Sequence, residues 1–188
     1  MSELRRGFKA WCERAAAGYR RELGLSPHQA LDPVELARLL NVLVITPEVL
    51  SGLSTSAATH LCVTDADSWS AVTLIEGERK LVILNPSHSA ARKNSDLAHE
   101  LSHIILEHKP TQAFFGPDKT LMIREFDRVQ EAEAECLSSV LLVPREALLA
   151  LLPISDDEVA AQQLGVSTQM FRMRRNVTGV DRQLARRW

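Results

Sequence analysis

Two histidines and a glutamate stand close together near the middle of the chain, in "AHELSHIILEH" (residues 98–108). On an α-helix His99 and His103 would lie one turn apart on the same face, so that both imidazoles could bind one metal ion. Glu100 would lie about 100° around the helix from His99, beside the metal, where it can take a proton from a water molecule. The HExxH pattern therefore predicts a metal site suited to hydrolysis.

A catalytic zinc ion usually takes three protein ligands and leaves its fourth position to water, so a third ligand is needed. The nearest candidate, His108, does not fit the HExxHxxGxxH pattern, because that pattern requires glycine at 106 and histidine at 109, where this chain has Leu106 and Lys109. We expect His108 to lie at the end of the helix and to interact with the helix dipole.

Three further candidates lie in "QEAEAECLSSVLLVP" (130–144), which reads as a second helix. Side chains two residues apart on a helix point about 200° away from each other, so these glutamates cannot all face one metal ion. The sequence predicts that one of them is the third ligand: Glu131, Glu133 or Glu135.

The hydrophobic pattern predicts several helices around these residues. The HExxH helix should begin at a cap formed by Asn94 or Ser95 and run to about His108. Apolar residues at steps of three or four predict a docking helix over 3–23, and Asp32 with Pro33 predicts the start of another. The remaining helices are expected at about 124–142 and, after a capping box at Ser155 and Glu158, on either side of Gly165.

Short segments rich in β-branched residues predict strands at 41–47, 61–64, 70–75 and 80–85, with a hairpin turn between the last two and a loop over 52–59. A small, mainly antiparallel sheet followed by a run of helices is typical of the α+β class. A chain of 188 residues can bury a core of its own without disulfides.

Composition also indicates the cellular compartment of the protein. The three cysteines (Cys12, Cys62 and Cys136) have unrelated spacings, the first residues lack the apolar core of a signal peptide, and no run of about 18 apolar residues could span a membrane. We therefore expect a soluble cytoplasmic protein. Net charge is −2, but the ends (1–30 and 165–188) are basic and the middle is acidic, a pattern that would suit contact with nucleic-acid phosphates.

Two stretches resemble the ImmA/IrrE family of bacterial metallopeptidases: "ILNPSHSAARKNSDLAHELSHIILEH" (83–108) and "EAEAECLSSVLLVP" (131–144). Residues 31–45 and 159–180 resemble the family more weakly. The chain departs from the family pattern at Ser102, which replaces a glycine, at 94–96, which replace Arg-Phe-Thr, and at 135–136, where Asn and a variable residue are usual. These departures remove none of the expected functional residues.

The resemblance implies a zinc endopeptidase, with manganese as the alternative metal, in which Glu100 is catalytic and His99, His103 and Glu133 bind the metal. Glu133 is preferred over Glu131 by counting back from "LLVP". A metallopeptidase domain with N-terminal docking helices is expected over 1–148, and a helix-turn-helix-like extension over 149–188. The implied substrate is a helix-turn-helix repressor whose cleavage derepresses a stress, mobile-element or anti-phage operon, bound as an extended peptide beside an edge strand.

Other hypotheses remain open at this stage. The tail with Arg172, Arg174 and Arg175 fits a DNA-binding module with a structural or inactive metal site, and the basic ends fit single-stranded DNA as an activating signal. The thiolate of Cys62 or Cys136 could regulate the metal site by occupying the water position. His60 and His88 are candidates for groups that face the substrate.

Overall fold

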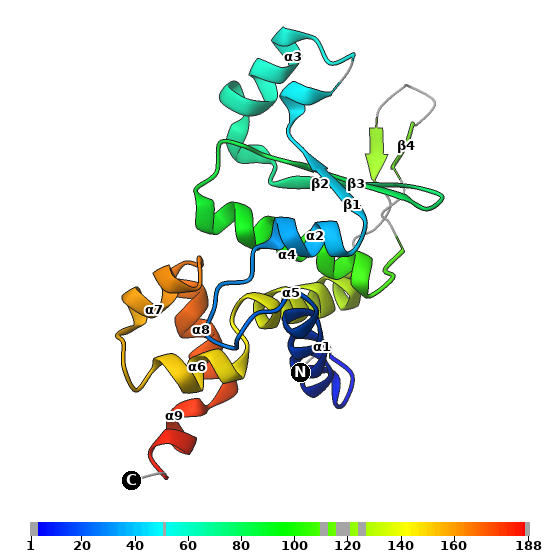
Figure 1. Ribbon diagram of the computed structural model, residues 1–188. Helices are drawn as coiled ribbons and strands as arrows, with labels where there is room; N and C mark the ends of the chain where they lie inside the picture. Colours follow the sequence, from blue (N-terminus) through cyan, green and yellow to red (C-terminus); the bar gives the residue numbers. More distant parts are fainter. Residues whose placement is uncertain (1–3, 51, 110–112, 116–120, 124–126, 187–188) are drawn as a thin grey trace.

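Helix α4 (Ala90–Ile105), which carries the histidine pair, lies between a small sheet and the other long helices. The computed structural model describes residues 4–50, 52–109, 113–115, 121–123 and 127–186. On one side α4 contacts strands β2 (Ala71–Glu76) and β3 (Arg79–Leu84), and on the other it contacts α5 (Arg128–Leu142) (Figure 1). The helix that must position the metal ligands is therefore held from two sides.

The sheet has the strand order β1-β3-β2, so β1 (Val42–Ile45) and β2 are its edges. β1 runs parallel to β3, and β2 pairs antiparallel with β3 through a two-residue turn in which Gly77 adopts φ +59°. A further antiparallel pair is formed by β4 (Ala113–Phe115) and β5 (Leu121–Ile123). The expected α+β class and the hairpin are confirmed.

The two faces of the three-stranded sheet differ in burial. Val82 in the central strand is fully buried, and its neighbours across the sheet, Val44 and Thr73, lie on the same face, which is turned toward α4. The opposite face carries Leu43 and Leu74, whose side chains are 61% and 50% exposed. One apolar face of the sheet thus forms the core and the other is open.

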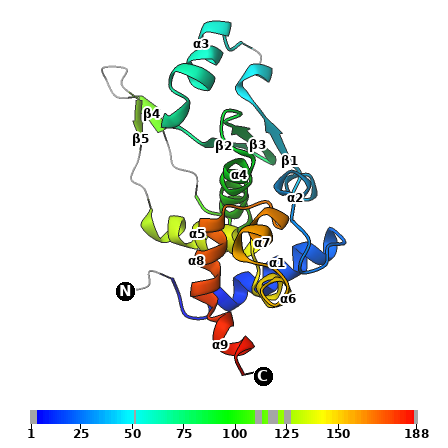
Figure 2. The same ribbon diagram turned by 90° about the vertical axis from the view of Figure 1, so that its left-hand side faces the viewer.

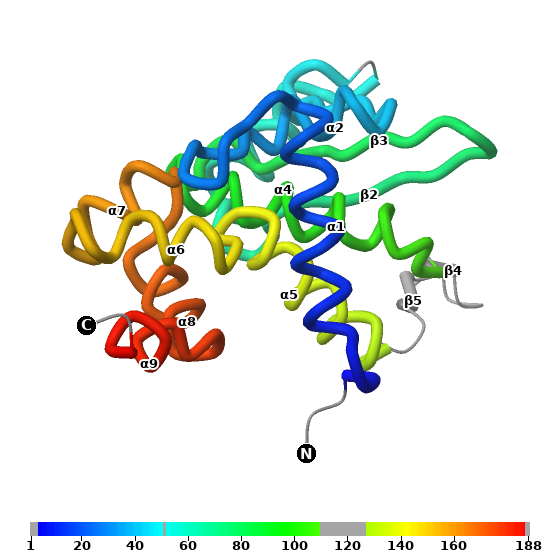
Figure 3. Tube along the Cα trace, turned by 60° about the horizontal axis from the view of Figure 1, so that its bottom comes forward, coloured from blue at the N-terminus to red at the C-terminus, as the bar shows by residue number. Residues whose placement is uncertain are grey.

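The remaining helices surround α4 and α5. Helix α1 (Phe8–Glu22) lies against α5, and α2 (Pro33–Leu39) lies against α4 (Figure 3). Both agree with the expected helices, and the Asp32 carboxylate accepts a hydrogen bond from the Val34 amide at 2.8 Å, as a cap before Pro33 should. Short 3-10 turns follow at Pro47–Val49 and Ala66–Ser68.

The C-terminal part is a group of four short helices, α6 (Arg145–Leu151), α7 (Asp157–Gln163), α8 (Thr168–Thr178) and α9 (Val180–Leu184) (Figure 2). The two helices expected around Gly165 are α7 and α8, and Gly165 turns the chain with φ +68°. Asp156, and not Ser155, caps α7. The expected domain boundary at 148/149 falls inside α6, and the buried core continues across it; the division into two units stays a prediction.

The strand expected at 61–64 is wrong, as is the loop expected before it. Ser54 caps helix α3 (Thr55–Thr59) by accepting a hydrogen bond from the Ala57 amide at 3.2 Å, and the chain continues as a turn of π-helix, η2 (His60–Thr64). The Val63 side chain is 72% exposed. A β-branched residue favours a strand only where a sheet offers it packing, and here none does.

The expected bounds of α4 and α5 also need correction. Helix α4 begins about one and a half turns earlier than expected, at a cap formed by Ser89. Asn94 donates instead to the Gly165 carbonyl at 2.9 Å, and Ser95 donates to the Ala91 carbonyl at 3.0 Å. Helix α5 begins at Arg128, directly after the cap residue Asp127. Residues 124–126 of the expected helix lie outside the described residues. In the part of the chain that is described, no helix has the length and apolarity needed to cross a membrane.

Two buried arginines bind the C-terminal end of α5. Arg20 of α1 donates to the carbonyls of Leu141 and Leu142 at 3.1 and 3.3 Å, and Arg174 of α8 donates to the Val143 carbonyl at 2.9 Å. The last carbonyls of a helix lack partners within the helix and carry partial negative charge. Burial lowers the pKa of Arg20 to about 10, so it stays charged at neutral pH.

We expect Arg20→Met to lower the free energy of unfolding by about 2–4 kcal/mol, because the change leaves buried carbonyls without their charged donor. Urea denaturation followed by circular dichroism measures the change. The matched control is Arg21→Met on the exposed side of the same helix, for which we expect less than about 0.5 kcal/mol. Equal effects of the two substitutions would contradict the capping role.

Candidate metal centre

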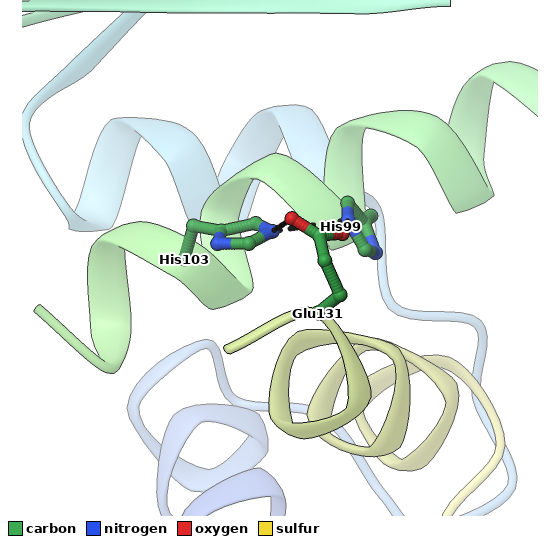
Figure 4. A group of neighbouring side chains, drawn as sticks. All are labelled: His99, His103 and Glu131. Atoms are coloured by element: carbon green, nitrogen blue, oxygen red, sulfur yellow. Dashed lines mark hydrogen bonds and ion pairs between the residues drawn. The ribbon is translucent and has the colours of Figure 1, made fainter. Parts of the chain in front are cut away.

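His99, His103 and Glu131 converge between α4 and α5. The Nε2 atoms of the two imidazoles are 3.0 Å apart, and the Glu131 carboxylate lies 3.2 Å from His99 Nε2 and 3.5 Å from His103 Nε2. Figure 4 shows the carboxylate between the two rings, with Glu131 coming from α5 and both histidines from α4. All three side chains are between one fifth and one third exposed, so solvent reaches them.

The separations of these donor atoms are close to those around a tetrahedral ion, for which bonds of about 2.05 Å would put neighbouring ligand atoms about 3.3 Å apart. The two Nε2 atoms are 3.0 Å apart, His99 Nε2 lies 3.2 Å from Glu131 Oε2, and His103 Nε2 lies 3.5 Å from Glu131 Oε1. Two imidazoles and one carboxylate are also a donor set that suits zinc and that manganese accepts. Among the described residues, this is the group of His, Cys, Asp and Glu side chains whose ligand atoms converge in this way.

Glu133, the expected third ligand, does not lie beside the two imidazoles, and the identity of the third ligand stays a prediction. Glu131 shares its face of α5 with Ala134 and Ser138, which are buried, and this face is turned toward α4. Glu133 points about 200° away, and its carboxylate lies 3.3 Å from His108 Nε2 and 3.5 Å from Arg5 Nε. The geometry therefore favours Glu131, which the count from "LLVP" had placed second.

His103 is suited to ligation at neutral pH. Burial, together with the neighbouring His99, lowers the pKa of its imidazole to about 4, although the Glu131 carboxylate acts in the opposite direction. Its ring is therefore neutral at pH 7, and a neutral ring has a lone pair to offer to a metal ion.

Glu100 lies on the side of α4 that faces the sheet. Its carboxylate accepts a hydrogen bond from the hydroxyl of Thr73 on the edge strand β2. Burial raises the pKa of the Glu100 carboxyl, although the Thr73 hydrogen bond and His99 oppose the shift. A carboxylate beside a metal site can accept a proton from water and later return it, as a general base and acid does. The role of Thr73 was not predicted, because no sequence spacing relates it to Glu100.

A histidine paired with a carboxylate lies near the start of α4: His88 just precedes the helix, and Asp96 lies on it one turn before Glu100. His88 is buried, its Nδ1 lies 2.9 Å from the Asp96 carboxylate, and its Nε2 faces the Asn85 amide at 3.5 Å. Asn85 itself donates to the carbonyls of Ala66 and Trp69, at 2.7 and 2.9 Å. His88 thus stabilises the connection between β3 and α4. His60, the other histidine expected to face a substrate, is exposed on η2.

The two cysteines considered as regulators of the metal have other neighbours. Cys136 lies on the α1 side of α5, where a hydrogen bond from the Cys12 thiol lowers the pKa of Cys136 to about 7. Cys62 on η2 interacts with the Glu48 side chain. Neither belongs to the group of converging ligand atoms in the described part of the chain.

Comparison with known protein families gives one match, to the IrrE N-terminal-like domain of the peptidase M78 family, over residues 55–176. The chain belongs to this family. Comparison with curated proteins gives no match. The M78 family consists of metal-dependent peptidases, which agrees with the donor set of His99, His103 and Glu131. The M78 match begins at α3 and ends within α8, so α1, α2 and β1 lie outside it.

We expect Glu131→Gln to weaken zinc binding by more than 100-fold, because loss of an outer hydrogen bond to a ligand already costs roughly 10- to 100-fold and a direct ligand contributes more. Competition with a chelating dye measures the affinity. The control is Glu135→Gln, an exposed position on the same helix, which should bind zinc like the wild type. A zinc affinity of Glu131→Gln equal to that of the control would rule out Glu131 as a ligand.

Proposed function

We propose that this chain is a zinc-dependent endopeptidase, with manganese as the alternative metal, and that its substrate is a helix-turn-helix transcriptional repressor in the cytoplasm. One observation carries the proposal: three metal-ligand side chains converge beside a half-buried glutamate that is hydrogen bonded to a sheet edge. The converging side chains can hold a metal ion, and the sheet edge can place a peptide next to it. Cleavage of the repressor would derepress a stress, mobile-element or anti-phage operon.

His99, His103 and Glu131 would hold the metal, which supplies a Lewis acid for the scissile carbonyl. Glu100 takes a proton from the attacking water and later delivers it to the departing amine. The Thr73 hydroxyl holds the Glu100 carboxylate on the sheet side of the site, so that the base stays in place while the proton moves. The raised pKa of the Glu100 carboxyl makes its carboxylate a stronger base toward the attacking water.

The edge strand β2 is the place where a substrate would bind. An edge strand has unpaired backbone groups, and an extended peptide can pair with them main chain to main chain. Thr73 on this strand touches Glu100, so a peptide beside β2 would run past the catalytic carboxylate. Alternate residues of the peptide would continue the exposed apolar face of the sheet, which includes Leu74 and Val72.

A repressor fits this binding mode only at a segment that can become extended. Helices satisfy their own backbone groups and cannot add to a sheet edge, so the scissile bond should lie in a linker between helices or in a terminal arm. The apolar face of β2 favours substrates with apolar residues at alternating positions.

We expect Glu100→Gln to retain zinc and to lose cleavage by at least roughly 100-fold, because the amide cannot take a proton from water. The measurement is incubation of the purified protein with the repressor encoded by the adjacent gene, followed by electrophoresis and mass spectrometry of the fragments. Glu135→Gln is the control and should cleave like the wild type. Full cleavage by Glu100→Gln, or none by the wild type with zinc, would contradict the proposal.

DNA would stimulate the enzyme through the basic N-terminal helix α1 rather than through the helix-turn-helix-like tail. In the tail, Arg172 and Arg175 form ion pairs with Asp157, and Arg174 is buried and paired with Glu13. By contrast, Lys9 and Arg14 are exposed on α1. Helix α1 lies on the far side of α4 and α5 from the three-stranded sheet (Figures 1 and 2), so DNA bound to α1 would leave β2 accessible.

We expect single-stranded DNA to shift the protein in a gel at low salt, with an affinity that falls steeply as salt rises. Replacing both Lys9 and Arg14 by glutamate should weaken the shift, because it removes positive charge from the exposed side of α1. Replacing the exposed Glu35 on α2 by glutamine is the control. Absence of any shift at low salt would remove DNA from the proposal and leave the peptidase unaffected.

A further inference from the structure

His103 has a second contact on the side of its ring opposite the metal ligands. Its Nδ1 atom lies 3.0 Å from Nδ1 of His108, and His108 Nε2 lies 3.3 Å from the Glu133 carboxylate. The rings of His103 and His108 meet edge to face, with centroids 5.0 Å apart. The His108 and Glu133 side chains are only 7% and 15% exposed, so solvent competes little with these contacts.

The end of α4 brings His108 to this position. Glu107 adopts a left-handed conformation with φ +53°, the Glu107 amide donates to the Ile104 carbonyl at 3.2 Å, and the His108 amide donates to the His103 carbonyl at 3.0 Å. These two bonds define a Schellman motif, which folds the chain back over the last turn of the helix. The imidazole of residue 108 therefore lies beside that of residue 103. A left-handed residue at this position is usually glycine, and here it is a glutamate.

The contacts determine where the ring hydrogens lie. A carboxylate can only accept, so His108 Nε2 donates to Glu133. With its hydrogen on Nε2, His108 offers an acceptor at Nδ1, and the 3.0 Å separation of the two Nδ1 atoms then fits a hydrogen bond donated by His103 Nδ1. Nε2 of His103 is left with a lone pair that faces His99 and Glu131.

Glu133 is itself held in place by a charge. Arg5, which stacks its guanidinium 5.1 Å from the centre of the Phe8 ring, lies 3.5 Å from the second oxygen of the Glu133 carboxylate. Arg5 is 68% exposed, so the ion pair is screened and serves mainly to orient the carboxylate.

We infer that Glu133 and His108 form an outer chain of hydrogen bonds that fixes the tautomer and orientation of His103, so that its Nε2 lone pair points into the metal site. Both are positioning residues that act through His103. The inference rests on the proposed metal site, and it assigns roles to two residues that are not ligands in the observed geometry. Removal of a residue that orients a metal ligand through a hydrogen bond typically weakens metal binding by roughly 10- to 100-fold.

The first test needs no metal. Long-range ¹H–¹⁵N correlation spectra of the metal-free wild type at neutral pH should show His103 with its hydrogen on Nδ1, although free neutral histidine favours Nε2–H. His108→Leu should return His103 to Nε2–H. A wild-type His103 with its hydrogen on Nε2 would overturn the inference, whether or not the protein cleaves anything.

The second test measures zinc affinity by chelator competition. His108→Leu should bind zinc roughly 10- to 100-fold more weakly than the wild type, and His108→Gln should recover part of the loss, because an amide can accept from His103 and donate to Glu133. Glu133→Leu should resemble His108→Leu. His28→Leu, at an exposed histidine far along the chain, is the matched control and should bind zinc like the wild type.

The outcomes separate this inference from the proposed function. Unchanged zinc affinity in both His108→Leu and Glu133→Leu would overturn the outer chain while leaving the peptidase intact. Conversely, a wild type that binds zinc but cleaves no repressor would overturn the proposed substrate and leave the tautomer and affinity results standing. If His108→Leu fails to fold, the wild-type spectrum together with His108→Gln and Glu133→Gln still decides the question.

Discussion

The contact between α4 and α5 sets the distances from Glu131 to both imidazoles of the candidate metal centre, because α4 supplies the histidines and α5 supplies Glu131. Small residues are buried in both helices, Ala98 and Ser102 in α4 and Ala134 and Ser138 in α5, and small side chains allow two helices to approach closely. The Ser102 hydroxyl donates to the Ala98 carbonyl at 2.7 Å, so it is satisfied without a partner from α5. The serine that replaces the family's glycine is therefore compatible with a closely packed interface.

What depends on local spacing could be predicted from the sequence. His99, Glu100 and His103 lie on one helix, and their mutual placement follows from its period alone. The hairpin of β2 and β3 follows from β-branched segments separated by a glycine turn. The α+β class follows from the order of such segments along the chain.

What depends on the rotation of one helix against another could not be predicted. Choosing between Glu131 and Glu133 requires knowledge of which face of α5 meets α4 and which meets α1, and burial is continuous from Leu137 to Leu142, so no single face of this helix stands out. The position of His108 depends on a left-handed turn at Glu107, a residue type that gives no signal for such a turn. The strand expected at 61–64 was wrong because β-branched residues form a strand only where tertiary packing offers them a sheet.

The buried core includes residues that lie before the region of M78 similarity. The similarity begins at residue 55, yet the buried Arg20 that binds the end of α5 and the Glu13 that pairs with Arg174 both come from α1. A fragment trimmed to the recognisable peptidase sequence would expose the α1-facing side of α5, including Leu137 and Val140, and would leave Arg174 buried without its counterion. The minimal functional piece of this protein must therefore begin upstream of α1, because the segment with the least family resemblance closes the core on which the catalytic helices rest.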